Sequence, residues 1–541
     1  MNSTGGAGGG PTDPAASERS GPRARRAGLL LGVTLFIALL FWPGLDPLQR
    51  RVAATTALTA ALWLTVAIPV GAASLLPAVL FPLLGVMPAK EVAPIYLRDL
   101  VMLFLGAFVV ALGLERWGVH RRIALFVVQT IGSSRRRLVL GFMAASAFLS
   151  MWINNTATTL LMLPIVGAVL ARADEEDGAG GADPRFAWCL LLGVAYASSV
   201  GGMGTPVGTA PNQEFLGQFA DRFPEGPKFT FGEWFVCFAP LPLLFVPLAW
   251  VLLTRVVYRF SDPRSGGAAE AVAEERAALG PMTTPERRMA AVFAATALLW
   301  VFRADVRLGS VVVPGWSRLL LGPEAADAAW YAQHKNDISD ATVATLMAVL
   351  LFVLPSGARG ADGAPPEEAG RRYLMDWRTA ARLPWEVLLL LGGGFCLAQG
   401  FKVSGLDAVV GGMVGPLIEG LPAWSVVALV ALFVSLLTEV TSNTATTAVL
   451  LPVMAAAAVQ AGVDPLLVML PATIAASAAF MMPVATPPNA VVFATRRIPV
   501  PKMARAGVLL NLLMVGLITL VFEFWVRDRL GIGVEVPTWA R

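Results

Sequence analysis

Residues 153–165 read INNTATTLLMLPI, and residues 441–453 read TSNTATTAVLLPV. Each copy places a polar phrase before an apolar run that reaches a proline, Pro164 or Pro452. A second pair of phrases follows in the same order, GMGTPVGTAPN at 202–212 and MPVATPPN at 482–489. LFLGAF at 103–108 is likewise echoed by LLLGGG at 389–394. Three matched landmarks in one order predict an internal repeat.

The composition predicts a membrane protein. Hydrophobic residues make up 56% of the 541 positions and charged residues 14%, against about 25% charged in soluble domains. Apolar runs repeatedly reach or approach the roughly 20 residues of a membrane span. We therefore predict an all-α polytopic membrane protein with about eleven transmembrane helices and two re-entrant hairpins.

The same composition argues against several functions. The net charge of +4 comes from basic residues in loops, so we expect lipid and not nucleic acid as a partner. The three cysteines form no CxxC pair and there are only two histidines, which argues against a metal enzyme. An intramembrane enzyme would also need a nucleophile and base, and the sequence offers no such set. We expect neither catalysis nor an organic cofactor.

The charge pattern predicts the orientation of the chain. Basic residues gather after the even-numbered crossings, for example at 135–137, 287–288 and 496–497. Cytoplasmic loops carry such an excess, so we expect a cytoplasmic N-terminus in a bacterial-type inner membrane. The repeated landmarks fall on the fourth and ninth crossings and on the fifth and tenth. Because this offset is odd, we expect the second copy to be inverted in the membrane.

These features predict a domain organisation. The first inverted repeat spans 98–258, with a hairpin at 138–170 and a broken helix at 188–220. The second spans 384–526, with a hairpin at 425–460 and a broken helix at 465–495. The remaining segments are a disordered cytoplasmic tail at 1–26, scaffold helices at 27–97, a cytoplasmic loop at 259–286 despite its helix-like AAEAVAEERAAL, scaffold helices and loops at 287–383, and a C-terminal tail at 527–541.

The repeated phrases suit the binding of an anion together with a cation. Glycines and prolines interrupt both expected broken helices, at 201–211 and 483–488. Inverted repeats with broken helices are typical of secondary transporters, whose site lies near the membrane midplane. NNT and SNT supply amides and hydroxyls without an Arg or Lys; with exposed backbone N–H groups these suit a carboxylate, while carbonyl oxygens suit sodium. The alternative is that small polar residues only hold the helices together.

The phrases resemble those of the divalent anion/sodium symporter family, the INDY-type carriers of dicarboxylates, citrate and sulfate. TSNTATTAVLLPV and MMPVATPPNAVVF look like its second hairpin and its broken tenth helix, and ASAAFMMPVATPPNAVV matches its sodium:sulfate signature. The resemblance covers roughly residues 98–526. It implies an elevator-type homodimer that imports C4-dicarboxylates, such as succinate, malate or fumarate, together with sodium.

The resemblance also implies a set of site residues. The first sodium site would use Ser150, Asn154, Asn155 and the backbone around Gly204. The second would use Thr438, Ser442, Asn443 and the backbone around Ala485. The substrate carboxylates would meet Asn155, Thr156, Thr205, Ser442, Asn443, Thr444, Thr486 and Pro487.

Asn154 departs from the family, whose first phrase has a serine there. Its carboxamide could coordinate sodium through the oxygen, or its NH₂ group could fill the space of the ion. A sodium-independent dicarboxylate exchanger therefore stays an alternative, as does a sulfate or tricarboxylate symporter.

A proton-coupled exporter would need acids at the breaks, where only Glu439 qualifies, and a channel gains nothing from a two-sided site. Glu439 either takes part in coupling or forms structural hydrogen bonds near the hairpin.

Overall fold

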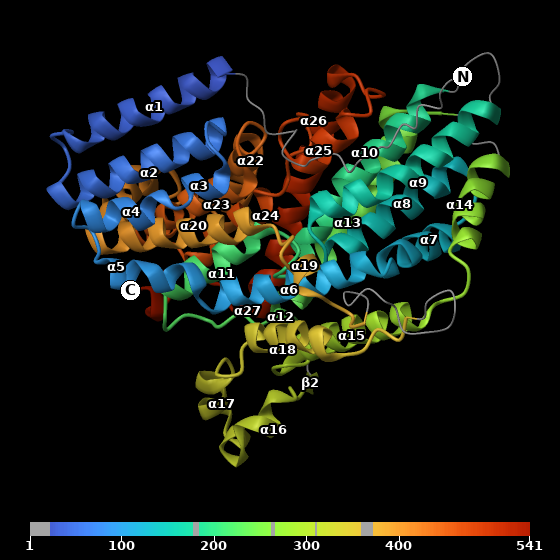
Figure 1. The fold of residues 1–541 in the computed structure, drawn as a ribbon. Helices are drawn as coiled ribbons and strands as arrows, with labels where there is room; N and C mark the ends of the chain where they lie inside the picture. The colour runs from blue at the N-terminus through green and yellow to red at the C-terminus, as the bar shows by residue number, and fades with distance from the viewer. Residues whose placement is uncertain (1–21, 177–182, 261–265, 309–310, 359–371) are drawn as a thin grey trace, which may run out of the picture.

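The computed structural model describes residues 22–176, 183–260, 266–308, 311–358 and 372–541, and helices dominate them (Figure 1). The chain is an all-α polytopic membrane protein, as predicted. Seven helical stretches of the described residues are long and apolar enough to cross a membrane: Ala89–Arg116, Asn155–Glu176, Pro184–Gly204, Phe231–Val257, Trp385–Ser404, Asn443–Gln460 and Val500–Leu530. Shorter apolar helices lie at several of the other predicted crossings.

The N-terminal helices precede the first repeat. They are α1 (Pro22–Leu40), α2 (Pro47–Thr65), α3 (Val70–Ala73), α4 (Leu76–Leu83), α5 (Ala89–Val92) and the 3₁₀ segment Ala93–Leu97. Residues 22–26, predicted to belong to a disordered tail, are already helical, since Pro22 takes the first position of a helix, where its missing N–H costs no hydrogen bond. Residues 1–21 lie outside the described residues.

The next helices cover the segment expected to form the first repeat. They are α6 (Asp99–Arg116), α7 (Val119–Ile131), α8 (Arg135–Ser150), α9 (Asn155–Glu176), α10 (Pro184–Gly201), α11 (Ala210–Arg222), α12 (Phe231–Phe238) and α13 (Pro240–Val251). A short turn joins α8 to α9, and irregular backbone separates α10 from α11. α8, α9, α10 and α13 lie together on the right of Figure 1.

The central segment differs from its prediction. The expected loop at 259–286 contains helix α14 (Gly266–Ala278), because Ala268, Ala271 and Val272 are buried where α14 meets α7 and α9. Two short antiparallel strands, β1 (Val306–Leu308) and β2 (Val311–Val313), pair with each other. The remaining helices are α15 (Thr284–Val301), α16 (Ser317–Leu321), α17 (Ala328–His334), α18 (Asp340–Val353) and α19 (Trp377–Ala380).

The last helices cover the segment expected to form the second repeat. They are α20 (Trp385–Ser404), α21 (Leu406–Val414), α22 (Ala423–Leu437), α23 (Asn443–Gln460), α24 (Leu466–Ala475), α25 (Pro487–Phe493), α26 (Val500–Val521) and α27 (Arg527–Leu530). The predicted C-terminal tail is docked on the protein. The ring of Trp539 packs edge-on against Phe219 and Phe223 of the first broken helix, and Val463 pairs with Glu535.

The described core consists of two separate hydrophobic clusters. The smaller joins α2–α5 to one face of α20, including Leu390 and Phe401. The larger runs from α6 to the end of the chain and includes Leu391 and Phe395 on the other face of α20. Glycines let α20 approach its neighbours closely, since a Cβ on Gly393 would lie 2.6 Å from the Ser74 carbonyl oxygen. α20 thus contributes to both clusters, and so does α23, with Ala445 in the smaller and Leu451 in the larger.

Candidate functional site: two hairpin tips and two broken helices

The first hairpin tip is the turn between α8 and α9. Its hydrogen-bond network favours an Asn155 amide with the nitrogen turned inward. In that orientation the nitrogen donates to Ser150 Oγ at 2.6 Å, to the Ser198 carbonyl at 3.1 Å and to the Gly208 carbonyl at 3.3 Å. Asn155 thus ties the hairpin tip to α10 and to the break that follows α10.

The second hairpin tip, between α22 and α23, has the corresponding pair. Thr438 Oγ1 lies 2.7 Å from Asn443 Oδ1 and 2.9 Å from the Ala476 carbonyl oxygen. The hydroxyl and the carboxamide are five residues apart in both pairs, and Asn155 and Asn443 each open a helix. The two tips therefore place a hydroxyl beside a carboxamide at the same spacing, with the amide nitrogen toward Ser150 at the first tip and the amide oxygen toward Thr438 at the second.

Asn154 holds the start of α9. Its Oδ1 accepts a hydrogen bond of 2.9 Å from the backbone N–H of Ala157, which is the contact of a helix N-cap. Ser442, at the matching position before α23, is exposed and its side chain makes no capping bond. Thr156 and Thr444, next in each phrase, are half-buried. The Asn154 side-chain oxygen, which the resemblance implied as a sodium ligand, thus accepts a hydrogen bond from the backbone of α9.

The irregular backbone of the first break is held together by side-chain hydrogen bonds and by a close backbone approach that requires glycine. A Cβ on Gly208 would lie 2.5 Å from the Gly202 carbonyl oxygen, so only glycine permits this approach. Asn212 Nδ2 donates to the carbonyls of Gly202 at 3.1 Å and Thr205 at 2.7 Å. Thr205 Oγ1 donates to the Met151 carbonyl at 2.5 Å, which fastens the break to the hairpin tip. Gly204, expected near sodium, is buried between them.

The second break repeats this construction. Asn489 Nδ2 donates to the carbonyls of Ala479 at 3.1 Å and Met482 at 3.0 Å. Thr486 caps α25 by accepting from the Asn489 N–H at 3.3 Å. Ala485 is buried beside it, whereas Pro487 is exposed. An asparagine at the start of the second half-helix therefore anchors the irregular backbone in both copies.

Glu439 accepts hydrogen bonds from the backbone N–H groups of the second break. Its two carboxylate oxygens accept from the N–H groups of Phe480, Met481 and Met482 at 2.7 to 3.0 Å. Asn511 Nδ2 of α26 donates to Oε1 at 2.7 Å. The side chain is buried, and these bonds favour the structural role, the second of the two alternatives raised by the sequence. Without Glu439 these N–H groups would lose their acceptor.

The structure joins the two broken helices. Thr209 Oγ1 lies 3.3 Å from Ser477 Oγ, which links the first break to the second. The Tyr196 hydroxyl of α10 donates to the Phe480 carbonyl at 2.8 Å. The hairpins cross over, since α9 packs on α25 and α23 packs on α11. The predicted site residues therefore belong to one interlocked assembly.

The two breaks differ in exposure. Residues 201–209 are all buried. At the second tip and break, Val440 is 70% exposed and Val484 is 82% exposed, and Ser442 is exposed as well. The first break is thus enclosed by the protein, whereas parts of the second tip and break lie at its surface.

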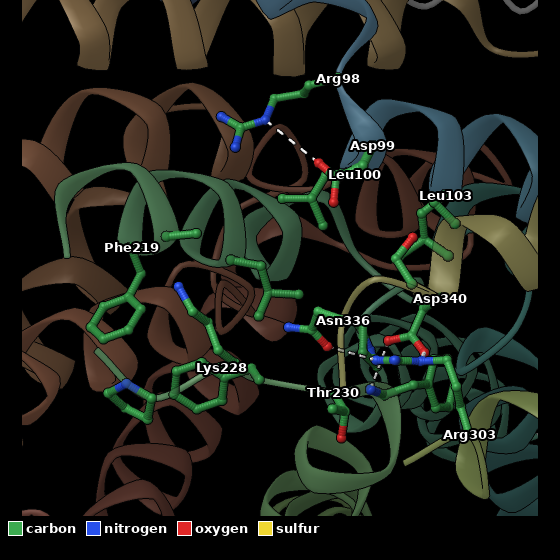
Figure 2. A pocket seen from close by; sticks show the side chains of 18 of the residues that line it. Arg98, Asp99, Leu100, Leu103, Phe219, Lys228, Thr230, Arg303, Asn336 and Asp340 are labelled. Carbon is green, nitrogen blue, oxygen red and sulfur yellow. Dashed lines mark hydrogen bonds and ion pairs between the residues drawn. The ribbon is translucent and has the colours of Figure 1, made fainter. Parts of the chain in front are cut away.

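A cavity of about 120 Å³ lies beside the first break (Figure 2). Pro206 of the break lines it, together with Arg98, Lys228 and Arg303. Thr205 and the other predicted site residues do not line it. Sequence reasoning did not point to this cavity, because its lining comes from segments far apart in the chain.

Most of the positive charge in this cavity is compensated. Arg98 pairs with Asp221, with Nη2 and Oδ1 2.8 Å apart. Arg303 is buried and pairs with Asp340 (Figure 2). Lys228 donates to a neutral group, the Pro224 carbonyl, and not to an acid. The cavity therefore offers little net charge to a dianion, and the paired tips and breaks are the better candidate site.

Sequence reasoning missed the asparagine anchors and the buried acid Glu214 on α11. Asn212 and Asn489 could have been found, because each ends a repeated phrase, TAPN or TPPN. Glu214 had no such signal, since nothing in the matching phrase corresponds to it. The Glu214 side chain is fully buried.

These helices, with paired breaks at the centre of the molecule, define a polytopic all-α membrane transporter. Residues 24–529 match the family described as the sodium:sulfate symporter transmembrane region, and the chain belongs to that family. It is 37% identical over 518 residues to a protein of Staphylococcus saprophyticus named sodium-dependent dicarboxylate transporter SdcS, covering 94% of this chain and 93% of the relative. A Staphylococcus aureus protein of the same name is 35% identical over 516 residues, with the same coverage.

Two solved structures share the fold at 13% identity. The YdaH transporter of Alcanivorax borkumensis aligns with a TM-score of 0.51, covering 80% of this chain and 85% of that one. MtrF of Neisseria gonorrhoeae aligns with a TM-score of 0.53 over 94% of this chain and 96% of that one. At this identity the likeness concerns the architecture alone.

Proposed function

We propose that the protein imports C4-dicarboxylates of the succinate, malate and fumarate class together with sodium. The observation that carries this proposal is the matched pair of tips, Ser150 with Asn155 and Thr438 with Asn443, each beside a broken helix. Neutral amides and hydroxyls bind an anion weakly enough to release it, and sodium supplies the positive charge. The relatives named sodium-dependent dicarboxylate transporters support the choice of both substrates.

In this proposal each tip contributes one sodium site. The first uses Ser150, Asn155 and the backbone around Gly204, with Asn154 supporting them from the helix start. The second uses Thr438, Ser442, Asn443 and the backbone around Ala485. The substrate carboxylates lie between the tips, against Asn155, Thr156, Thr205, Ser442, Asn443, Thr444, Thr486 and Pro487.

We also propose an elevator movement in a homodimer. The smaller cluster supports it, because the N-terminal helices and one face of α20 form a hydrophobic body of their own, which the second hairpin joins through Ala445 and Ala448 at the start of α23. The interlocked hairpins and broken helices form the moving unit, and the N-terminal helices with α20 form the fixed one. The second repeat is inverted relative to the first, with the N-terminus in the cytoplasm.

The experiment is uptake and counterflow of labelled succinate in proteoliposomes, with sodium or with choline on both sides. Sodium-dependent uptake with a Hill coefficient above one is the expected result. A thermal-shift series with succinate, malate, sulfate and citrate identifies the anion, because a ligand that binds the folded state raises the unfolding midpoint by mass action. Stabilisation by sulfate or citrate alone would overturn the choice of a C4-dicarboxylate.

A sodium-independent dicarboxylate exchanger is the second candidate. The engagement of Asn154 Oδ1 by the Ala157 N–H favours it, because that oxygen is taken from the first ion site. Full-rate counterflow in choline would establish the exchanger and exclude sodium coupling. Sulfate and tricarboxylate symport are distinguished by the same anion series.

The orientation is tested by cysteine labelling in intact cells. Arg137 and Glu419 are exposed and precede the two hairpins. Arg137→Cys should react only with a permeant reagent, and Glu419→Cys also with an impermeant one. Labelling of both from the same side would contradict an inverted second repeat.

A further inference from the structure

Two buried acids lie among the helices of the site, and their surroundings differ. Glu439 is surrounded by N–H donors, as described above. Glu214 of α11 is fully buried, and its Oε2 accepts one hydrogen bond, from Gln218 Nε2 at 2.9 Å. Its Oε1 has no hydrogen-bond partner among the described residues. Gln218 is itself held by donating to the Ala448 carbonyl of α23 at 3.1 Å.

The carboxyl group of Glu214 lies directly against the backbone of α20. A Cβ on Gly394 would be 2.4 Å from Glu214 Oε1 and 2.8 Å from Oε2, so the space exists only because residue 394 is glycine. The next residue of α20, Phe395, packs its ring against Gly217 of α11, which likewise has no side chain. Glu214 thus lies where a helix of the proposed moving unit touches α20, which belongs to the proposed fixed unit.

The charged groups around α11 do not compensate an ionised Glu214. Neither α23 nor α24, which both pack on α11, contains a titratable residue. The groups on the other neighbours are Arg98 and Asp99 at the start of α6, Glu115 and Arg116 at its far end, Glu386, Cys396 and Lys402 on α20, and Asp221 and Arg222 at the end of α11 itself.

The nearby cations among these groups already have partners. Arg98 bonds Asp221 and stacks on Phe395, with its guanidinium 4.8 Å from the ring centroid. Arg222 pairs with Asp407, and Lys402 Nζ donates to the Asp221 carbonyl at 2.5 Å. A buried carboxylate with a single neutral donor is unfavourable in the interior of a membrane protein.

We propose that Glu214 is a proton-binding site, held as the neutral acid against Gly394, and that α11 moves along α20 only while the proton is bound. The inference rests on the proposed function, in which α11 belongs to the moving unit. The proton comes from water when the carboxyl group is exposed and returns to water when it ionises. Ionised Glu214 would keep α11 from docking on α20, so transport falls at alkaline pH.

Succinate uptake from pH 6 to 9.5 tests this proposal with three proteins. Wild-type uptake should fall by roughly tenfold per pH unit above the transition, because only the protonated fraction is competent. Glu214→Gln, which is permanently neutral, should keep its uptake across the range. Glu225→Gln removes the same charge from an exposed site on the following loop and should keep the wild-type profile. The ionisation of succinate affects all three equally.

Two outcomes of this assay would overturn the proposal. Identical pH profiles for wild type and Glu214→Gln would show that Glu214 does not titrate during transport. Loss of uptake at every pH in a folded Glu214→Gln would show that the negative charge is needed, as a bound cation such as sodium would require.

Thermal unfolding in detergent gives a readout independent of transport. A native state that holds a proton on Glu214 binds one proton more than the unfolded state, so its stability falls as pH rises. The wild-type unfolding midpoint should therefore drop between pH 6 and 9 relative to that of Glu214→Gln. Parallel midpoints would overturn the proton site. If the wild-type midpoint drops relative to that of Glu214→Gln but the protein does not transport succinate, the proposed function is wrong and the proton site stands.

Discussion

The hydroxyl of Thr438 lies 2.7 Å from the carboxamide oxygen of Asn443, across the turn that opens α23. Asn443 therefore presents its amide at a fixed angle at the accessible tip. Asn443→Ala removes that amide, and we expect uptake to be lost while expression and unfolding midpoint stay near wild type. Gln460→Ala, at the far end of the same helix, is the control. Wild-type uptake by Asn443→Ala in proteoliposomes would remove this residue from the site.

Asn154 is expected to act first as a helix cap. Asn154→Ala should destabilise the protein by about 1 kcal/mol, because the Ala157 N–H loses its acceptor. Asn154→Ser retains a capping oxygen and should keep both stability and the sodium dependence of uptake. Midpoints and sodium titrations of the two variants check this. Equal midpoints for Asn154→Ala and wild type would show that the cap contributes nothing.

Glu439→Gln should weaken the second break. A carboxamide offers one oxygen and turns an NH₂ group toward backbone donors, so at least one buried N–H loses its acceptor at a cost of about 1–3 kcal/mol. We expect a lower unfolding midpoint and reduced uptake at every pH. Glu419→Gln, on an exposed loop, is the control. A changed pH profile with unchanged stability would instead place Glu439 in proton coupling.

Asp464, in the loop between α23 and α24, makes stability depend on pH. Burial raises the pKa of its carboxyl group to about 6, although the N–H groups of Leu466 and Gly533 oppose the shift. The ordinary value is about 3.9, so the folded state binds more protons than the unfolded state between about pH 4 and 6. Stability therefore falls as pH rises through this window.

Asp464→Asn keeps an acceptor for the Leu466 N–H without the charge. We expect it to unfold at a higher temperature than wild type at pH 8 and at the same temperature at pH 4. Asp528→Asn, an exposed neighbour on α27, should show no such difference. A gain that is equal at both pH values would show that Asp464 does not titrate in this range.

The composition and apolar runs predicted the fold class, and the structure has a helix–turn–helix or irregular backbone at each repeated phrase, because glycine, proline and capping residues act locally. The repeated phrases also placed Ser150 five residues before Asn155 and Thr438 five before Asn443, which the structure brings into contact. Membership of the family follows from the same residues.

What the sequence did not predict depends on tertiary contacts. α14 forms because its alanines are buried against α7 and α9, which a polar stretch of 259–286 does not reveal. The capping of α9 by Asn154 and the contact of Glu214 with Gly394 join groups whose distance is set by helix packing. Glu439 could be singled out by its position. The backbone N–H groups of Phe480, Met481 and Met482, which favour a structural role for it, are brought to its carboxylate only by the fold.

The division of the core into two clusters has a consequence for how the protein comes apart. The smaller cluster joins the rest of the protein along α20 and at the starts of α21 and α23. A protein built in this way need not lose its structure in a single cooperative transition. The N-terminal helices can detach and expose the α20 face that carries Leu390 and Phe401, while the interlocked hairpins stay folded. Detergent or lipid that binds this newly exposed face then decides whether the separation is reversible.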